Sequence, residues 1–322
     1  MNQALGLLFS LAVAVALALS FVQRPLPPQP PTEVQMDHLL MLDGLNMDGR
    51  LISVGQHGQI FISDDHGQHW QRVDSPTDAT LTALAPVDEQ RLVAVGHDSV
   101  IVLSTDRGRH WQLVFAQPQA EEPLLAVNFD PQGQGIAVGA YGRYLYSQDG
   151  GQTWQPQVLS DEDMHLNGIA AVGSALLLAG EAGTLLRSDD GGQQWYALDS
   201  PYQGSFFGLL AVADGAVLAY GMRGQVYLSP DAGQTWQPVV TATESALFAG
   251  WADQQQVILA GHNGQVLYSR DAGRSFTSID TASSRSFTAV TPTGRPAEWL
   301  LSGEQGGQKL DLPTGFLPEI QP

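Results

Sequence analysis

From about residue 38 onward, the apolar residues fall in short runs of four to six, and turn residues such as Gly, Asp, Asn and Ser separate the runs. A typical stretch contains four runs in succession, at residues 208–212, 216–220, 225–229 and 235–239. Short apolar or alternating runs bounded by turn residues predict β-strands. No helical pattern of 10 residues separates these runs, and parallel strands need helical crossovers, so the pattern predicts antiparallel sheets.

One motif, Ser-x-Asp-x-Gly-x-x-Trp, recurs along the chain at a nearly constant distance. Its six copies are Ser63-Asp65-Gly67-Trp70, Ser104-Asp106-Gly108-Trp111, Ser147-Asp149-Gly151-Trp154, Ser188-Asp190-Gly192-Trp195, Ser229-Asp231-Gly233-Trp236 and Ser269-Asp271-Gly273-Phe276. Successive serines are 41, 43, 41, 41 and 40 residues apart. Four strands in a repeat of about 40–45 residues are typical of one blade of a β-propeller.

A second motif, Gly-x-x-Gly, stands eight residues before each copy of the first. It occurs at Gly55/Gly58, Gly139/Gly142, Gly180/Gly183, Gly221/Gly224 and Gly261/Gly264, with a variant at Gly96/Ser99 and a seventh copy at Gly303/Gly306. The sequence therefore predicts an all-β, seven-bladed β-propeller over residues 38–322, with four-stranded blades and the first motif in six of the seven. The outer strand of the last blade is either residues 316–320 or residues 33–36.

The residue types of the first motif suit a tight turn. An Asp carboxylate can accept hydrogen bonds from the backbone N–H groups of its own turn. Glycine can adopt a positive φ without strain from a Cβ atom. Five of the seven Trp residues stand at the motif's last position, where a large aromatic ring can fill the gap between blades. We therefore assign a structural role to six aspartates: Asp65, Asp106, Asp149, Asp190, Asp231 and Asp271.

The motif resembles the Asp-box, or BNR repeat, of neuraminidase-like propellers. One box per blade in a single seven-unit chain resembles the photosystem II stability/assembly factor family and its bacterial, non-photosynthetic relatives, over about residues 38–310. The resemblance implies a non-catalytic scaffold. Photosynthetic members help to insert the precursor of a photosystem II reaction-centre subunit, and bacterial relatives often accompany exporters of the resistance-nodulation-division (RND) type. The arginines of this chain are few and scattered, which departs from the photosynthetic pattern and favours an exporter or another envelope complex.

The N-terminal residues predict export. Residues 4–22 carry no charge and are mostly apolar, and a Pro-rich stretch follows them. We interpret residues 1–23 as a signal peptide or membrane anchor and residues 24–37 as a linker that holds a domain away from a surface. The small residues around Ala18 and Ser20 provide cleavage sites, so both alternatives stay open. The expected location is the periplasm, with residues 4–22 as the anchor to the inner membrane if they are retained.

The charge balance excludes some partners. The chain has 33 acidic and 14 basic residues, a net charge of −19 and one lysine, Lys309. Binding to nucleic acid depends on clustered Lys and Arg, so we expect no nucleic-acid partner. The absence of cysteine excludes disulfides, thiolate metal sites and thiol nucleophiles. We expect no cofactor.

Two enzyme classes share the box. The resemblance to sialidases would require an Arg-Ile-Pro segment, and Arg24-Pro25 lacks the Ile. Xyloglucanase-type enzymes cleave between two propellers, whereas this chain has the length of one. His57, His97, His262 and the acidic residues 161–163 come from different blades without metal-ligand spacing. We therefore expect neither catalytic residues nor a metal site, and a secreted glycan-binding or glycoside-hydrolysing, sialidase-like propeller remains the alternative.

The turns between second and third strands, together with the connections between blades, should share one face of the propeller, opposite the boxes. Rigidly held loops with aromatic, Arg and Met side chains suit protein recognition. The candidate partner-binding residues are Tyr141, Arg143, Glu181, Tyr202, Met222, Arg223, His262 and Asn263. The sequence thus favours a non-catalytic envelope scaffold that binds a membrane protein complex, such as an RND-type exporter, and assists its assembly or stability.

Overall fold

The computed structural model describes residues 6, 13, 35–159, 163–253 and 255–312. The chain divides into two units, Met1–Val34 and Gln35–Pro322. The predicted signal peptide or anchor and most of the predicted linker lie outside the described residues. Among the described residues, no helix combines the length and the hydropathy that a membrane span requires.

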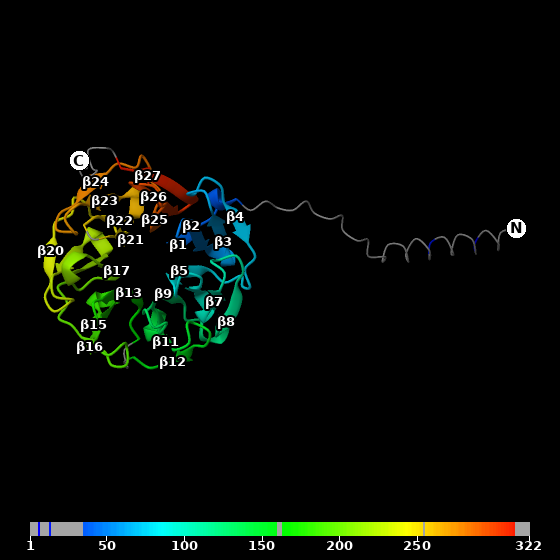
Figure 1. The fold of residues 1–322 in the computed structure, drawn as a ribbon, viewed down its shortest axis with the longest axis horizontal. Helices are drawn as coiled ribbons and strands as arrows, with labels where there is room; N and C mark the ends of the chain where they lie inside the picture. The colour runs from blue at the N-terminus through cyan, green and yellow to red at the C-terminus, as the bar shows by residue number, and fades with distance from the viewer. Residues whose placement is uncertain (1–5, 7–12, 14–34, 160–162, 254, 313–322) are drawn as a thin grey trace. The chain divides into compact units, whose positions relative to one another are not determined.

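The second unit is a ring of seven antiparallel sheets, which confirms the predicted all-β, seven-bladed propeller (Figure 1). The innermost strands are β1 (Met41–Met47), β5 (Leu81–Pro86), β9 (Leu124–Phe129), β13 (Leu166–Val172), β17 (Phe206–Ala211), β21 (Leu247–Ala252) and β25 (Phe287–Pro292). Each is followed by the other strands of its own sheet, so a blade is one continuous stretch of chain. We number the blades one to seven in chain order, from β1–β4 to β25–β27.

The remaining strands lie progressively further from the ring's centre. The second strands are β2 (Arg50–Gly55), β6 (Leu92–Gly96), β10 (Gly135–Gly139), β14 (Ala175–Gly180), β18 (Val217–Gly221), β22 (Val257–Gly261) and β26 (Glu298–Gly303). The third strands are β3 (Ile60–Ser63), β7 (Ile101–Ser104), β11 (Tyr144–Ser147), β15 (Leu185–Ser188), β19 (Val226–Ser229), β23 (Val266–Ser269) and β27 (Gly306–Asp311). The outer strands are β4 (Gln71–Val73), β8 (Gln112–Phe115), β12 (Gln155–Pro156), β16 (Tyr196–Ala197), β20 (Gln237–Val239) and β24 (Thr277–Ile279).

Nine short 3-10 helices connect the strands within the described residues. They are η1 (Met36–His38), η2 (Gln56–Gly58), η3 (His97–Ser99), η4 (Pro118–Ala120), η5 (Ala140–Gly142), η6 (Glu181–Gly183), η7 (Ala213–Gly215), η8 (Met222–Gly224) and η9 (His262–Gly264). Six of them, η2, η3, η5, η6, η8 and η9, are the turns between second and third strands.

The hydrophobic core lies between blades. One buried cluster joins Ile52 and Val54 of blade one to Leu81 and Leu92 of blade two, and Trp111 packs against its edge. Corresponding clusters join later pairs of blades, each with the aromatic residue of one box. Because each sheet buries both faces against its neighbours, the second strands are buried along their whole length.

The box turn is held by a repeated set of hydrogen bonds. In blade three, Ser147 Oγ donates to Asp149 Oδ1 over 3.0 Å and accepts the Gly151 N–H over 3.0 Å. The same Asp149 oxygen accepts the Thr153 N–H over 2.9 Å, and Trp154 Nε1 donates to the Gly151 carbonyl over 3.0 Å. The box glycine has a φ of +80°. The Trp side chain therefore lies between blades just before the outer strand, at a place fixed by the turn.

We expect Asp149→Ala to lower the free energy of unfolding by about 1–2 kcal/mol, because the buried serine hydroxyl and the turn N–H groups lose their acceptor. Asp199→Ala is the matched control, since Asp199 is exposed and should change the free energy by less than about 0.5 kcal/mol. Urea unfolding followed by tryptophan fluorescence measures both. Equal effects of the two substitutions would contradict a structural role for the box carboxylate.

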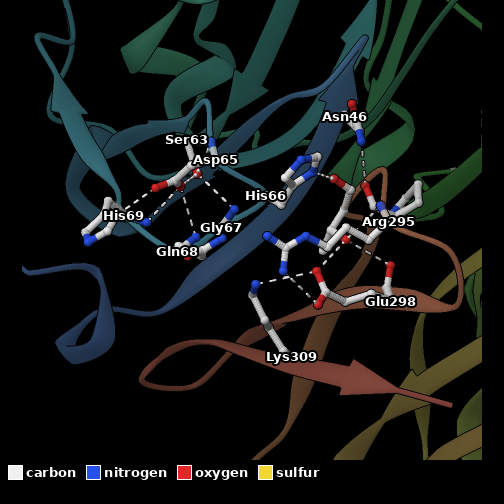
Figure 2. Close-up of polar contacts among 12 residues, drawn as sticks. Asn46, Ser63, Asp65, His66, Gly67, Gln68, His69, Arg295, Glu298 and Lys309 are labelled. Carbon is white, nitrogen blue, oxygen red and sulfur yellow. Dashed lines mark hydrogen bonds and ion pairs between the residues drawn. The ribbon is translucent and has the colours of Figure 1, made fainter. Parts of the chain in front are cut away.

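The last blade has three strands within the described residues and no box. In its place, the buried Glu298 accepts a hydrogen bond from Thr293 Oγ1 over 2.7 Å, and its carboxylate lies 3.4 Å from Lys309 Nζ and 3.7 Å from Arg295 Nη1 (Figure 2). The lysine and the arginine thus compensate the charge of the buried carboxylate.

Side-chain contacts join the last blade to the first. The Asn46 amide donates to the Pro292 carbonyl over 2.8 Å, and His66 Nδ1 lies 2.8 Å from the Thr293 carbonyl (Figure 2). Thr288 Oγ1 also donates to the Met41 carbonyl over 2.6 Å. Of the two segments predicted to complete this blade, residues 316–320 lie outside the described residues. In the other, residues 33–36, only Gln35 and Met36 are described, and neither is in a strand.

Candidate binding face and central cavity

One face of the ring carries all the turns between second and third strands. Because each sheet is a simple up-and-down meander, these turns and the connections between blades lie at one edge, and the boxes lie at the other. We call the first edge the turn face. It is formed by η2, η3, η5, η6, η8, η9 and the equivalent turn at residues 304–306.

The seven turns repeat one backbone conformation. At the tip of each, an exposed residue other than glycine has a φ between 51° and 61°. The seven tips are His57, Asp98, Tyr141, Ala182, Arg223, Asn263 and Gln305. Left-handed residues other than glycine are uncommon and cost roughly 1 kcal/mol each. The turn face therefore presents seven different side chains on seven copies of the same scaffold.

A backbone hydrogen bond joins each turn to the connection that enters its own blade, and in five of the seven turns a second one joins it to the connection that enters the next blade; we call these bonds the clip. In blade four, the Glu181 N–H donates over 3.0 Å to the His165 carbonyl, which enters the same blade. The Gly183 N–H donates over 2.9 Å to the Gly204 carbonyl, which enters the next blade. The Gly306 N–H of blade seven donates in the same way to Leu39 of blade one, over 2.7 Å. The clip thus runs across the ring's closing junction and holds the turn face rigid.

The predicted partner-binding residues come from blades three to six and lie along the turn face rather than in one pocket. Tyr141, Met222, Arg223, His262 and Asn263 are exposed at turn tips or next to them. Tyr141 is 56% exposed and contacts the His165 ring edge-on, with 4.8 Å between ring centroids.

The other three predicted residues have structural contacts. Arg143 Nη1 lies 3.2 Å from the Glu122 carboxylate, and Glu181 accepts the His165 N–H over 2.8 Å. Tyr202 stacks on Tyr227, with ring centroids 6.1 Å apart. These three side chains therefore help to shape the connections beneath the tips.

The three histidines considered for a metal site are not brought together. His57, His97 and His262 stand on three separate turns, and residues 161 and 162 lie outside the described residues. Within the described part of the chain, no group of three or more His, Asp or Glu side chains has the geometry to hold a metal ion.

A cavity of about 440 Å³ lies among the innermost strands at the centre of the ring. Its walls come from β1, β5, β21 and β25, with Tyr220 of β18. Asp43 is the single carboxylate among the described lining residues, and no arginine lines the cavity. Hydrolysis of a glycosidic bond needs two carboxyl groups flanking the bond, so this cavity does not meet the requirement.

Comparison with known proteins identifies the type of propeller. Residues 116–249 match the family model of the photosynthesis system II assembly factor YCF48. The chain is therefore similar to the BNR propellers of the YCF48 type. This confirms the resemblance inferred from the boxes. The model of sortilin (neurotensin receptor 3) matches residues 58–157. No curated protein sequence matches the chain.

Solved structures agree on the fold. A structure of YCF48 bound to a D1 peptide is 16% identical, with a TM-score of 0.69 over 90% of this chain and 97% of YCF48. YCF48 from Cyanidioschyzon merolae is 14% identical, with a TM-score of 0.66 over 88% of this chain and 97% of that one. The GH74 enzyme of Niastella koreensis is 17% identical, with a TM-score of 0.67 over 85% of this chain, which spans 43% of the enzyme.

The sequence analysis did not single out the cavity residues Asp43, Tyr220 and Thr291, which come from blades one, five and seven. One signal was available, because Gly44 and Gly208 lie inside the inner strands β1 and β17, and a glycine inside a strand often marks a close approach. The tips at Asp98, Ala182 and Gln305 were also missed, although the Gly-x-x-Gly motif marks their turns.

Proposed function

We propose that this YCF48-like propeller is a protein-binding scaffold of the cell envelope that assists the assembly or stability of a membrane protein complex. The observation that carries the proposal is the turn face, where a rigid, repeated backbone presents a different side chain in each blade. The box face repeats the same Ser, Asp and Gly in six blades. Repetition maintains the fold, whereas variation on a rigid scaffold suits recognition of a partner.

The YCF48 likeness supports a protein partner, because one of the similar structures holds a D1 peptide. The finer proposal is an RND-type exporter subunit as the partner, with the propeller in the periplasm and residues 4–22 as its membrane anchor. The apolar N-terminal segment and the Pro-rich stretch after it motivate this location.

The glycan alternative is supported less well. The GH74 enzyme shares the fold, but this chain spans less than half of it, and the central cavity contains one lining carboxylate. A protein partner fits the exposed Tyr, Arg and Met side chains of the turn face better.

Site-directed crosslinking in native membranes tests the proposal. A photocrosslinking amino acid replaces Ala182, Arg223 or Asn263 in the full-length protein with an unmodified N-terminus. We expect each variant to form an adduct with the same membrane-complex subunit, because these tips are exposed on the turn face. Mass spectrometry identifies the adduct, and the intact mass shows whether the N-terminal segment is retained.

The matched control replaces Gln193, which is exposed on the box face of the blade that carries Ala182. Adducts from Gln193 equal to those from Ala182 would mean that the turn face is not the binding surface. A protein shed from the membrane without any protein adduct would refute the scaffold proposal and direct the search to glycans.

A further inference from the structure

The central cavity contains a carboxylate without a cationic partner among the described residues that line it. Asp43 Oδ1 accepts the Gly44 N–H over 2.7 Å, and Oδ2 accepts the Leu84 N–H of the next blade over 2.7 Å. Each oxygen keeps one lone pair for a further donor. None of the described residues that line the cavity is a Lys, Arg or His, so none of them neutralises the charge of Asp43.

Two glycines on innermost strands let hydroxyl groups reach this cavity. Gly208 of β17 pairs with Tyr220 of β18, and a Cβ atom at Gly208 would lie 2.2 Å from the Tyr220 hydroxyl. A Cβ atom at Gly44 would lie 2.5 Å from Thr291 Oγ1. The tyrosine from the second strand therefore extends across its own inner strand to the cavity wall.

The Thr291 hydroxyl is buried and has no hydrogen-bond partner among the described residues, and Tyr220 is a mostly buried residue that brings a second hydroxyl to the same cavity. Tyr220 is 5% exposed and Thr291 is 1% exposed. Buried polar groups in folded proteins are nearly always hydrogen-bonded, so the unpaired Thr291 hydroxyl at this cavity points to a bound species that pairs with it.

The rest of the wall combines polar side chains that are already hydrogen-bonded, Asn46, Thr82 and Thr288, with apolar and aromatic ones. Leu42, Leu45, Phe248 and Trp251 line the cavity, and Trp251 packs against Trp299 with 5.3 Å between ring centroids. A metal ion of the calcium type needs about six to eight oxygen ligands, which a single carboxylate and two hydroxyls do not supply. An apolar wall with aromatic faces suits the body of an organic cation.

We infer that the central cavity binds a small organic amine, with the ammonium group on Asp43, Tyr220 and Thr291 and the apolar body against Phe248 and Trp251. An ammonium group has three N–H donors and a positive charge, which match one carboxylate and two hydroxyl oxygens. The volume of about 440 Å³ falls in the usual range of small-molecule sites. The protein's net charge of −19 raises the local concentration of cations. This site is independent of the turn face.

Three probes of similar shape and different charge test the inference on the full-length protein. They are phenethylamine, 2-phenylethanol and 3-phenylpropionate, with binding measured by isothermal titration calorimetry at pH 7.5. We expect phenethylamine to bind at least about tenfold more tightly than the neutral and anionic probes, because an unneutralised carboxylate favours the cation. Calcium chloride is the fourth titrant, and we expect no binding of calcium.

Substitutions identify the site. Asp43→Asn should weaken phenethylamine binding at least about tenfold, and Tyr220→Phe should weaken it about threefold to tenfold, each by removing one acceptor of the ammonium group. Asp48→Asn is the matched control, because Asp48 belongs to the same blade and its side chain is 98% exposed. It should leave phenethylamine binding unchanged.

Some outcomes overturn the inference. They are equal binding of the three probes, no binding of any probe, binding of calcium in place of the amine, and equal effects of Asp43→Asn and Asp48→Asn. Thermal unfolding shows whether each variant is folded, and if Asp43→Asn fails to fold, Tyr220→Phe and Thr291→Val carry the test. Amine binding that persists while the turn face gives no crosslinked partner would refute the proposed function and leave this site intact.

Discussion

Gly264→Ala should lower the free energy of unfolding by more than about 3 kcal/mol, although it adds only one methyl group, because Gly264 is buried. Gly264 has a φ of +69°, and a Cβ atom there would lie 1.9 Å from the Ser283 carbonyl oxygen. The obstacle is backbone, and the Gly264 N–H donates over 2.7 Å to Arg285 in the same connection. Relief of the overlap would therefore break the clip between blades six and seven.

Gly173→Ala separates this clash from the cost of the backbone conformation. Gly173 has a φ of +63°, and nothing lies within 4 Å of its hypothetical Cβ atom. This substitution should cost only about 1 kcal/mol, the usual strain of a left-handed residue. Urea unfolding of both variants, followed by tryptophan fluorescence, gives the comparison. Equal losses of free energy of unfolding in the two variants would show that the left-handed backbone conformation alone, and not the clip, requires a glycine at position 264.

Blade two shows how a side chain can be accommodated in the same place. Ser99 replaces the second glycine of the motif, with a φ of +49°, and its Oγ donates to the Glu122 carbonyl over 2.8 Å. The hydroxyl thus forms a hydrogen bond with a carbonyl of the neighbouring connection. We therefore expect Gly264→Ser to be less destabilising than Gly264→Ala, since alanine offers no donor.

The architecture was predictable because each blade repeats the same turn chemistry. A glycine motif and a box at constant spacing mark the two turns on either side of the third strand in six blades, and the seventh glycine motif completes the blade count. The prediction was less informative about single side chains. Tyr202 is of a residue type that is common at binding surfaces. It packs on Tyr227 and Phe206, because the connection that carries it turns inward.

The cavity could not be predicted for a similar reason. Asp43, Tyr220 and Thr291 belong to three blades, and each blade looks ordinary when its repeat is read alone. These three side chains line the same cavity because the ring closes and because Tyr220 extends across Gly208. Repeats determine what blades have in common, whereas a site at the centre depends on how they differ.

Asp43 should make stability depend on pH in the direction opposite to the box aspartates. Burial raises the pKa of Asp43 to about 6, although the Leu84 and Gly44 N–H groups lower it. The folded state thus holds this proton more tightly than the unfolded state does. The resulting stabilisation is complete below about pH 4 and is lost as pH rises through about 6. The difference between about 6 and the ordinary value of 3.8 corresponds to roughly 3 kcal/mol.

The box aspartates act in the other direction. Hydrogen bonds from the N–H groups of His69 and Gln194 hold the pKa values of Asp65 and Asp190 below their usual range. Their contribution is present above about pH 4 and is lost as pH falls further. The wild-type profile therefore mixes both effects, and the Asp43 contribution has to be isolated by substitution.

Asp43→Asn isolates it, because the amide stays neutral and can still accept the Leu84 N–H. Relative to wild type, the variant's free energy of unfolding should rise by roughly 3 kcal/mol between pH 4 and pH 7.5. Tyr220 is the other titratable residue lining the cavity, and burial raises its pKa, so it stays neutral throughout this window. Urea unfolding at several pH values measures the difference, with Asp48→Asn as the control. The difference in free energy of unfolding between Asp43→Asn and wild type could instead stay constant with pH, as we expect for Asp48→Asn. That result would mean that the Asp43 carboxylate is solvated, and the electrostatic basis for amine binding in the cavity would be lost.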